Sequence, residues 1–578
     1  MVNKIAPCVM KFRIKSWYWI CLVSAGLFYL FFIWRNSFLI GQERYFSLFD
    51  DAMIAMRYAK NLADGFGLRW NPGEPPVEGY TNLLWTLYMS AIHLLPIAIS
   101  KTSLVVMLSG VGILFMNLLV VKKLTQAIAG ENPYAPLFAV LLTAFYYPLI
   151  YWTLRGMEVG LVCLLVNYSI LCVFRLCDRY SLRDVIGLTL TLAAALLTRP
   201  DMVVPIAVVG MFLLYVIWKS GFKLSYTIIP VGIVAVMCGL TLFRIRYYGD
   251  PLPNTYYLKV DGVTAFERAS RGIKALLELF FFHLWPVLLL VAVGFWKNAR
   301  LRQSPKAILL FGMFLAQAVY SVYVGGDAWE WMHFSNRYIT IAVPALFVVV
   351  STFLSDPETI KIKTFTPVLP ALGVGLFVDG LYCFNTNTAA FPAYGLGPAV
   401  LFIVVAGACV SPLYPRRSTV PPVFAATVTL IVCLALNFFG ISNWVSPRSD
   451  GELIPGDAVA AREGVALRQI TSPNAKIAYV WAGAMPYFAG REAVDLLGKS
   501  DPVIAKGKPA APFFPGHSKW NYAYSIGQLK PDLITSLWGV TPADMKNIAD
   551  WGYIPCDHGY YLKDSTNINR ALLKATRQ

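Results

Sequence analysis

The chain has 578 residues, of which 57% are hydrophobic and only 14% are charged, and its net charge is +17. So little charge excludes an ordinary soluble globular protein. The positive charge does not indicate a nucleic-acid partner, because much of the Lys and Arg lies in short loops between apolar runs and no basic stripe with interleaved aromatic residues is present. Membrane lipids are the partners that this composition favours.

The N-terminus predicts a first membrane helix. Lys4, Lys11, Arg13 and Lys15 precede the apolar run Trp17–Trp34, and no small-residue cleavage site follows it. The run therefore predicts a retained helix rather than a removed signal peptide, with the N-terminus in the cytoplasm.

Further apolar runs of about 20 residues predict more membrane spans. The run at 81–99 decides the topology. If it lies at the outer interface, the basic loops all face the cytoplasm with the N-terminus, as the positive-inside rule favours; if it crosses, they all face outward. We therefore predict about 13 spans and a C-terminal domain outside the cytoplasm of a bacterial inner membrane. The predicted spans are 17–34, 103–121, 136–154, 158–174, 185–198, 202–218, 225–243, 279–296, 307–324, 339–354, 365–382, 396–411 and 421–440.

The first outer segment carries the most informative chemistry. "DDAMIAMRYAKNLADG" has apolar residues at helical spacing after the pair Asp50–Asp51, with Arg57 inside and Gly65 at the end. This pattern predicts an amphipathic helix on the outer surface. An Asp at a helix start is usually a cap. Two adjacent acids that face a membrane-level cavity favour catalysis, because a carboxylate can take a proton from an attacking hydroxyl.

Other outer segments carry groups that bind phosphates and sugars, since Arg and Lys suit phosphate whereas Tyr and Asn suit hydroxyls. Each has a plainer explanation as a turn, a local ion pair or an aromatic belt. The phosphate-binding candidates are Arg155, Arg199, Arg246, Lys259 and Arg337. The sugar- or acceptor-binding candidates are Arg57, Glu78, Tyr80, Asn82, Glu158, Tyr247, Asn254, Tyr256, Asp327, His333 and His517.

Together these segments resemble the GT-C glycosyltransferases, which are polytopic membrane enzymes with polyprenyl-phosphate sugar donors. The resemblance covers the membrane part and rests on Asp50–Asp51, the interfacial helices around them and "YYGDPLPNTYY". Within this superfamily the chain is most similar to the mycobacterial terminal arabinofuranosyltransferase family. The shared segments are "DDAMIAMRYAKNLADGFGLRWNPGE", "VEGYTNLLW", "GGDAWEWMHFSNRY", "DLLGKSDPVIA" and "PGHSKW".

The resemblance implies an inverting glycosyl transfer to an extracytoplasmic glycan or glycolipid acceptor. An outer-loop Asp would be the general base, with Asp51 the first choice and Asp50 the second. The acceptor hydroxyl would attack the anomeric carbon, and the lipid phosphate would leave while basic side chains stabilise its charge. No cofactor is required by the pattern, and no His or Cys cluster suits a transition metal, but an acidic outer cavity leaves Mg²⁺, Mn²⁺ or Ca²⁺ open.

We expect two domains, a GT-C-like membrane domain at 1–442, with interfacial helices at about 45–99, and an α/β domain at 443–578. In the latter, "AKIAYVW", "EAVDLLG" and "PDLITS" predict strands, and "GAMPYFAG" predicts a turn into a short helix. A lipid or polysaccharide transporter and a membrane-anchored glycan-binding protein are the competing functions. The near absence of charges at mid-span disfavours the transporter.

Overall fold

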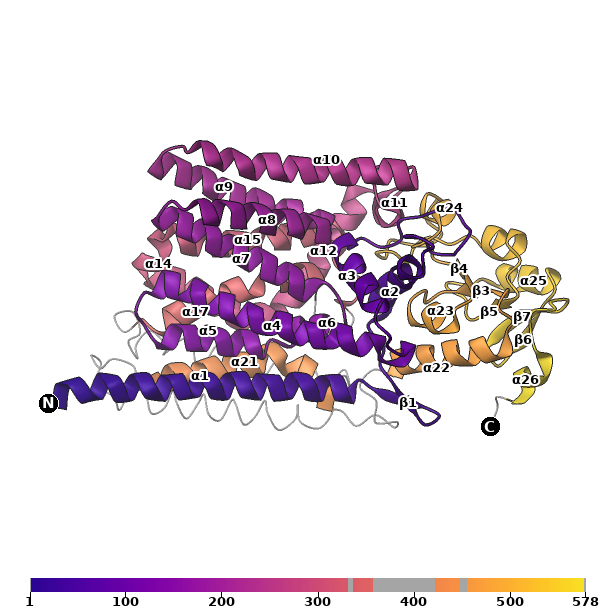
Figure 1. Cartoon of the computed structure of the whole chain (residues 1–578), viewed down its shortest axis with the longest axis horizontal. Coiled ribbons are helices and arrows are strands. Elements are labelled where there is room, and N and C mark those ends of the chain that lie inside the picture. The colour runs from indigo at the N-terminus through magenta and orange to yellow at the C-terminus, as the bar shows by residue number, and fades with distance from the viewer. Residues whose placement is uncertain (1, 331–335, 357–421, 446–454, 576–578) are drawn as a thin grey trace.

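The computed structural model describes residues 2–330, 336–356, 422–445 and 455–575. It contains a bundle of long helices that run side by side, with a smaller domain that carries a β-sheet at one end (Figure 1). Helix α1 (Val2–Arg35) starts at the far end of the bundle and runs along it toward that domain. The predicted fold class, a polytopic helical membrane protein with a C-terminal α/β domain, is confirmed.

Seven helical stretches in the described part of the chain are long and apolar enough to cross a membrane. The pair α5 and α6 forms an eighth if a bend of 52° between them is accepted within one span. The helices concerned are α1, α4 (Ile99–Ala129), α5 (Tyr134–Ala144), α6 (Tyr147–Leu154), α7 (Val159–Asp178), α9 (Val203–Ser220), α10 (Ile228–Tyr248), α12 (Ala265–Leu279) with α13 (Trp285–Lys297), and α15 (Pro305–Tyr323). Shorter or less completely described are α8 (Leu182–Thr198), α17 (Val343–Leu354) and α21 (Pro422–Val445). The predicted spans at 365–382 and 396–411 lie outside the described residues, so the total of 13 stays a prediction.

An ion pair and a hydrogen bond join three helices at one end of the bundle. At the end away from the sheet domain, Lys306 Nζ lies 2.7 Å from the Asp178 carboxylate and 3.4 Å from the Ala127 carbonyl, which joins the ends of α4 and α7 to the start of α15.

The helix α3 (Leu83–His93) has 11 residues, which is about 16 Å of helix and half of a bilayer core. This helix is too short to cross a membrane by itself, which agrees with the prediction for the run at 81–99, and its place at the outer interface stays a prediction.

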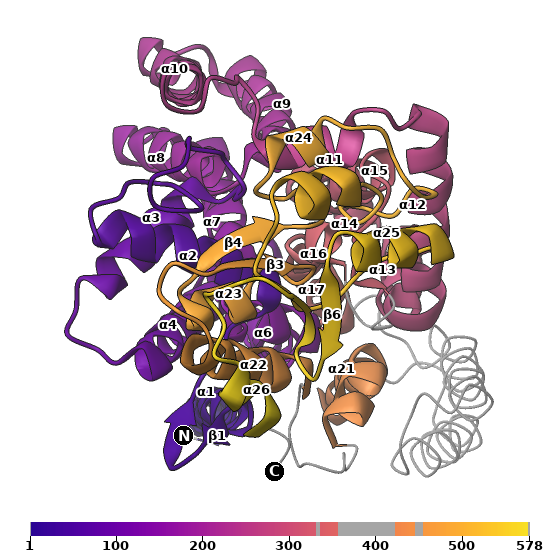
Figure 2. The same ribbon diagram turned by 90° about the vertical axis from the view of Figure 1, so that its right-hand side faces the viewer.

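Helix α2 (Asp50–Ala63) has the predicted length, and Gly65 follows it with a positive φ of 88°. Its position differs from the prediction, because every residue from Ala52 to Ala59 is buried rather than spread over an outer surface. The reason is the C-terminal domain, which stands in front of this end of the bundle in Figure 2. Arg57 of α2 donates to the carbonyl of Pro486 in that domain at 2.8 Å.

The C-terminal domain contains a five-stranded sheet in the order β4-β3-β5-β7-β6. The strands β3 (Lys476–Tyr479), β4 (Glu492–Asp495) and β5 (Leu533–Ile534) are parallel, whereas β7 (Gly559–Leu562) is antiparallel to β5 and to β6 (Tyr553–Cys556). Each of the three predicted strand segments contains one of the parallel strands. The predicted short helix is α23 (Ala484–Ala489). The predicted boundary at 442/443 falls within the end of α21, and it stays a prediction.

The remaining elements are short. They are β1 (Phe38–Ile40), β2 (Glu43–Tyr45), η1 (Pro200–Met202), η2 (Leu224–Thr227), α11 (Asn254–Val260), η3 (Phe280–Leu284), α14 (Ala299–Gln303), α16 (Arg337–Thr340), α22 (Pro455–Ile470), α24 (Pro502–Ala505), η6 (Ala523–Gln528), α25 (Pro542–Asp550) and α26 (Arg570–Ala575).

The predicted orientation is testable with cysteine labelling. Lys546 on α25 and Lys223 between α9 and α10 are both exposed, and they lie at opposite ends of the molecule. We expect a membrane-impermeant maleimide to label Lys546→Cys in intact cells but Lys223→Cys only after permeabilisation, each measured against the parent chain. The reverse pattern would place the C-terminal domain in the cytoplasm.

Candidate active site

A cavity of about 90 Å³ lies where α2, the segment 79–82, α11 and the C-terminal domain meet. Seven of the residues singled out from the sequence line it, although they are distant from one another along the chain. They are Asp51, Tyr80, Asn82, Glu158, Arg199, Lys259 and Arg337. Thr255, Tyr338 and Lys499 complete its polar wall.

Asp51 is the carboxylate that faces this cavity. Its Oδ1 accepts a hydrogen bond from Lys499 Nζ at 2.8 Å, and its Oδ2 accepts one from Arg337 Nη1 at 2.9 Å. The indole Nε1 of Trp329 lies 3.4 Å from the same Oδ2. Burial by itself raises the pKa of Asp51, but the charges of Lys499 and Arg337 outweigh it and hold the pKa well below its usual range. Asp51 is therefore ionised.

Asp50 points elsewhere. Its Oδ1 accepts a hydrogen bond from the backbone N–H of Ala484 at 3.0 Å, at the start of α23, and the residue does not line the cavity. Burial raises its pKa above the ordinary value. Asp50 therefore joins α2 to the C-terminal domain, while Asp51 is the acid available to a substrate.

Arg337 is held rigidly behind Asp51 by a second buried carboxylate. Asp327 accepts hydrogen bonds from Arg337 Nε at 2.8 Å, from Nη2 at 2.7 Å and from its backbone N–H at 3.0 Å. Asp327 is only 1% exposed and does not line the cavity. Burial raises the pKa of Asp327, but Arg337 outweighs that effect and lowers it. The predicted sugar-binding residue Asp327 thus supports the guanidinium and does not face a ligand.

Lys499 comes from a tightly bonded loop of the C-terminal domain. The Asp495 carboxylate at the end of β4 accepts the backbone N–H groups of Leu497, Gly498 and Ser500 at 3.0, 3.1 and 2.7 Å. Asn254, another predicted residue, donates to the carbonyl oxygens of Gly498 and Lys499 at 2.9 Å. These bonds fix the lysine against Asp51.

Lys259 on α11 is the cation without a partner. Within the described residues, its ammonium forms no hydrogen bond and no ion pair, yet it lines the cavity. Burial first, and repulsion by Arg337 second, lower the pKa of Lys259 to about 8. A cation in this position gains stability when an anion enters the cavity.

Arg199 and Glu158 form a polar network on another wall. Arg199 pairs with Asp201 through Nε at 2.8 Å and with Glu158 through Nη1 at 3.1 Å. Asn82 donates to the second oxygen of Glu158 at 2.9 Å. Arg199 is therefore already neutralised by two carboxylates and is a weaker phosphate ligand than the sequence predicts, whereas Asn82 and Glu158 present polar edges to the cavity.

Several predicted residues serve the framework. Arg244 clasps Glu78 through two hydrogen bonds of 2.7 and 2.9 Å. Tyr80 and Tyr248 share a hydrogen bond of 2.8 Å between their hydroxyls. The hydroxyl of Tyr247 accepts the backbone N–H of Leu68 at 2.9 Å. Of this group, only Tyr80 also lines the cavity.

Arg155, Arg246 and Tyr256 do not face the cavity. Arg155 is 1% exposed and forms an ion pair with Asp457 of α22. Arg246 is exposed, because the helical periodicity of α10 turns Arg244 inward in its place. Tyr256, on α11, is exposed as well. His333 lies outside the described residues.

The fold and this geometry are the basis for comparison with known proteins. The chain is similar to the crystal structure of ArnT from Cupriavidus metallidurans in the apo state, with 14% identity, a TM-score of 0.51 and coverage of 83% of this chain and 86% of ArnT. The structure of ArnT bound to undecaprenyl phosphate gives 14% identity, a TM-score of 0.50 and coverage of 82% and 85%. The structure of the arabinosyltransferase EmbB from Mycobacterium smegmatis gives 13% identity, a TM-score of 0.43 and coverage of 77% and 43%.

The chain has a GT-C-like fold. At these identities the likeness establishes the fold alone, and the arabinofuranosyltransferase resemblance stays a prediction. A domain of unknown function (DUF8728) matches residues 456–567, which is most of the C-terminal domain. A search of curated proteins gives no match.

His517 lies beside the site of this GT-C-like fold but does not line its cavity. Its ring contacts Trp329, Trp481 and Trp538, with centroid distances of 6.3, 6.0 and 5.6 Å. Burial, and then the charge of Lys499, lower the pKa of His517 to about 4, so the ring is neutral at physiological pH.

The carboxylates at the site do not fit a divalent cation. Throughout the described ranges, no group of three or more His, Cys, Asp and Glu residues is arranged to hold a metal ion. Both oxygens of Asp51 already accept from cations, and both oxygens of Glu158, the other carboxylate that lines the cavity, accept from Arg199 and Asn82. Mg²⁺ and Ca²⁺ require several oxygen ligands, which this donor set does not supply.

The functional residue that the sequence interpretation missed is Lys499. Its segment "DLLGKSDPVIA" was noted for its family resemblance, but nothing local showed that its lysine reaches an acid 448 positions away. Thr255 and Tyr338, which also line the cavity, were missed although their neighbours Asn254 and Arg337 were chosen.

The contact between α2 and the C-terminal domain yields a stability prediction. Arg57 is 6% exposed and donates to the carbonyls of Trp70, Pro486 and Arg491 and to Asn71 Oδ1, at 2.8 to 2.9 Å. We expect Arg57→Met to lower the stability by at least about 3 kcal/mol, because buried acceptors of charged hydrogen bonds lose their donor. Thermal unfolding of the purified protein measures the change.

Lys60→Met is the matched control. Lys60 lies on the same helix, but its side chain is 40% exposed and pairs with an exposed Asp64, so the change should be small. Equal thermal midpoints for the two variants would contradict the role assigned to Arg57.

Proposed function

We propose that the chain is an inverting membrane glycosyltransferase. It moves a sugar from a polyprenyl-phosphate donor to an extracytoplasmic glycan or glycolipid acceptor, and the family resemblance suggests arabinofuranose as the sugar. The observation that carries the proposal is the cavity in which the ionised Asp51 lies together with the half-buried ammonium of Lys259, which has no hydrogen-bond or ion-pair partner among the described residues. The fold supports it, since ArnT shares the architecture and has been solved with bound undecaprenyl phosphate.

The cations of the cavity suit a phosphate that carries a lipid. Lys259 offers three unused N–H donors, and Lys499 lies close enough to influence its pKa. A phosphate placed between these two ammonium groups would relieve their mutual repulsion and would meet charge-assisted donors. The site lies at the end of a bundle of apolar helices, where a polyprenyl tail has a membrane to enter.

The carboxylate supplies the base for the transfer. The acceptor hydroxyl oxygen attacks the anomeric carbon from the side opposite the phosphate, and the bond from that carbon to the phosphate oxygen breaks with its electron pair. The hydroxyl proton passes to Asp51. When the phosphate engages Lys499, the cationic stabilisation of Asp51 weakens, so donor binding raises the pKa of this base toward a useful value. Lys259 and Lys499 then stabilise the negative charge on the leaving phosphate.

Sugar hydroxyls have partners on the remaining walls. Asn82 and Glu158 are bonded to each other at 2.9 Å and line the cavity together with Thr255 and Tyr80. Amide, carboxylate and hydroxyl groups offer both donors and acceptors, as a polyol requires. These groups, and not the exposed Tyr256, are the ones we assign to sugar binding.

Replacement of the base tests the proposal. We expect Asp51→Asn to lower kcat by about 10² to 10⁴ for sugar transfer from a polyprenyl-phosphate donor, because the amide cannot accept the proton. Asp50→Asn should have a smaller effect, because Asp50 bonds to α23 and does not line the cavity. Asp64→Asn, at the exposed end of α2, is the control.

Radiolabelled sugar transfer to a glycan acceptor is the measurement. Full activity in Asp51→Asn would contradict the assignment of the base and would favour a transporter or a glycan-binding protein, neither of which needs this acid.

The pKa of Lys259 makes a separate prediction for pH. Because its pKa is about 8, Lys259 is charged below pH 8 and loses its charge as the pH rises through that value. The phosphate monoester is already fully ionised above about pH 7. We therefore expect the Kd for undecaprenyl phosphate to rise between pH 7 and pH 9.

Lys259→Arg should remove this pH dependence, since an arginine stays protonated over the whole range. Binding titrations in nanodiscs measure both proteins. A Kd that is independent of pH in the parent chain would remove Lys259 from the phosphate site.

A further inference from the structure

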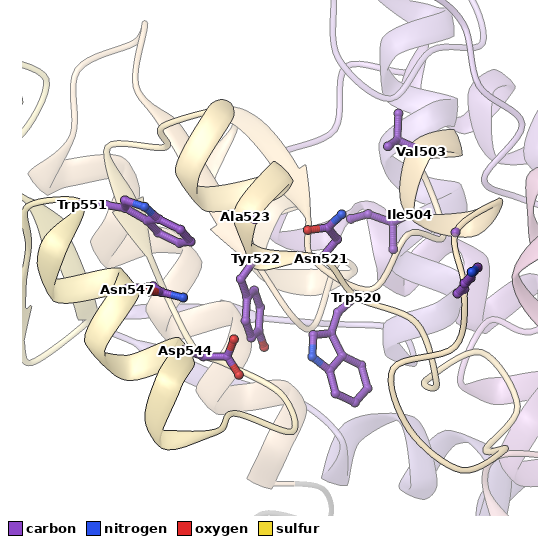
Figure 3. A pocket seen from close by; sticks show the side chains of 11 residues that line it. Val503, Ile504, Trp520, Asn521, Tyr522, Ala523, Asp544, Asn547 and Trp551 are labelled. Atoms are coloured by element: carbon purple, nitrogen blue, oxygen red, sulfur yellow. The ribbon is translucent and has the colours of Figure 1, made fainter.

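The C-terminal domain contains a second cavity, of about 370 Å³, that shares no lining residue with the first. It lies between α24, the segment 520–523 and α25. In Figure 3, Trp551, Asn547 and Asp544 lie on the side of α25 and face Tyr522 and Trp520, while Ile504 and Val503 lie on the opposite side. Nothing in the proposed transfer reaction uses these residues.

The aromatic walls of this cavity are fixed in place. A Cβ atom added at Gly539 would lie 2.6 Å from the Trp520 ring, and one added at Gly527 would lie 3.1 Å from the Trp551 ring. Both indoles therefore rest directly on glycine backbone. Tyr522 is held by its hydroxyl, which donates to the Trp538 carbonyl at 2.7 Å. Rigid aromatic surfaces lose little entropy when a ligand packs on them.

The amides of the cavity are available to a ligand. In the described part of the chain, the Asn547 side chain makes no hydrogen bond, and it is exposed at the cavity wall. Asn521 accepts the N–H of Tyr524 through Oδ1 at 3.1 Å, which leaves its NH₂ group free to donate. The only ionisable groups in the lining, Lys508 and Asp544, have opposite charges.

This combination matches a neutral saccharide. A sugar ring has an apolar C–H face, which packs on an indole, and a rim of hydroxyls, which exchange hydrogen bonds with amides. A phosphorylated ligand would instead require several cations. The volume lies within the range of small-ligand sites, at its lower end.

A row of aromatic rings leads from the neighbourhood of this cavity to the buried Trp329 beside Asp51. Trp538, which holds Tyr522, lies with its ring centroid 5.9 Å from that of Trp481, and Trp481 lies 6.4 Å from Trp329. Trp329 in turn is the residue whose indole N–H approaches Asp51. Trp481 and Trp538 are both half-buried, so a bound chain of sugars has aromatic surface along this path.

We propose that this second cavity is a saccharide-binding subsite that holds a distal sugar unit of an oligosaccharide acceptor. The subsite keeps the acceptor chain over Trp538 and Trp481 and so presents its far end to Asp51. Its role as an acceptor site rests on the proposed function, whereas its ability to bind sugar does not.

Binding to the full-length chain in nanodiscs tests the subsite. The probes are neutral hexasaccharides of arabinose, mannose, glucose and galactose, titrated by calorimetry. We expect at least one probe to bind, and Trp551→Ala and Asn547→Ala each to weaken its binding by about tenfold or more. Lys546→Ala, the exposed neighbour of Asn547 outside the lining, should bind as the parent does. Thermal midpoints show whether each variant is folded.

The variant Asp51→Asn separates this proposal from the transferase proposal. It should bind the hexasaccharide with unchanged affinity even though its transfer activity is lost. In transfer assays, Asn547→Ala should raise KM for the hexasaccharide but leave kcat unchanged, and it should leave KM for a monosaccharide acceptor unchanged. The absence of binding for every probe, or unchanged binding in both folded cavity variants, would overturn the subsite.

Discussion

One half-buried carboxylate is held by two cations, and these cations come from different parts of the molecule. Asp51 lies on the first outer helix, Arg337 follows the α15 span, and Lys499 belongs to the C-terminal domain. Because a partly desolvated charge is destabilised when it loses a partner, this contact favours the joint assembly of the three segments. The candidate active site is therefore also the contact that joins the membrane bundle to the α/β domain.

Further hydrogen bonds hold the residues of this contact in position. Asp327 orients Arg337 through three hydrogen bonds, and Asp495 shapes the loop of Lys499 through three more. Arg57 fixes α2 to the C-terminal domain on the other side. With Asp51, Arg337 and Lys499 held from behind in this way, the cavity keeps its charges close together without a ligand, and Lys259 carries the unbalanced charge that an anion would satisfy.

Local patterns were sufficient for much of the fold. The apolar spacing after Asp50–Asp51 predicted α2, and short β-branched runs predicted the three parallel strands of the C-terminal sheet. The burial of α2 could not be predicted. An amphipathic pattern shows which face of a helix is polar, but it does not show that Arg57, on that face, donates hydrogen bonds to carbonyl groups of the C-terminal domain. Hydropathy predicted the long apolar helices of the described part, but it did not separate the short helix α3 from them; the prediction that the run at 81–99 does not cross came from the parity of the basic loops, together with Pro96 and the polar start of the run.

Asp51, Lys259 and Arg337 could be chosen from the sequence because each is a charged residue in a predicted outer segment, and all three line the cavity. The site was not predictable where a partner is distant in sequence. Arg155 was expected near Glu158 or a phosphate, yet it pairs with Asp457, and Glu158 pairs with Arg199. Arg244 and Arg246 differ by two positions on one helix, and only packing shows that Arg244 is the buried member. Lys499 was missed because the residues around a loop lysine do not show which distant carboxylate it will contact.

A cryo-EM structure of the full chain with undecaprenyl phosphate would locate the phosphate site. We expect density for the phosphate within about 3 Å of the ammonium groups of Lys259 and Lys499, beside Asp51, with the lipid tail running into the helical bundle. Density for the phosphate at the opposite end of the bundle, near Lys306, or at any position from which Asp51 cannot reach the anomeric carbon, would contradict this placement.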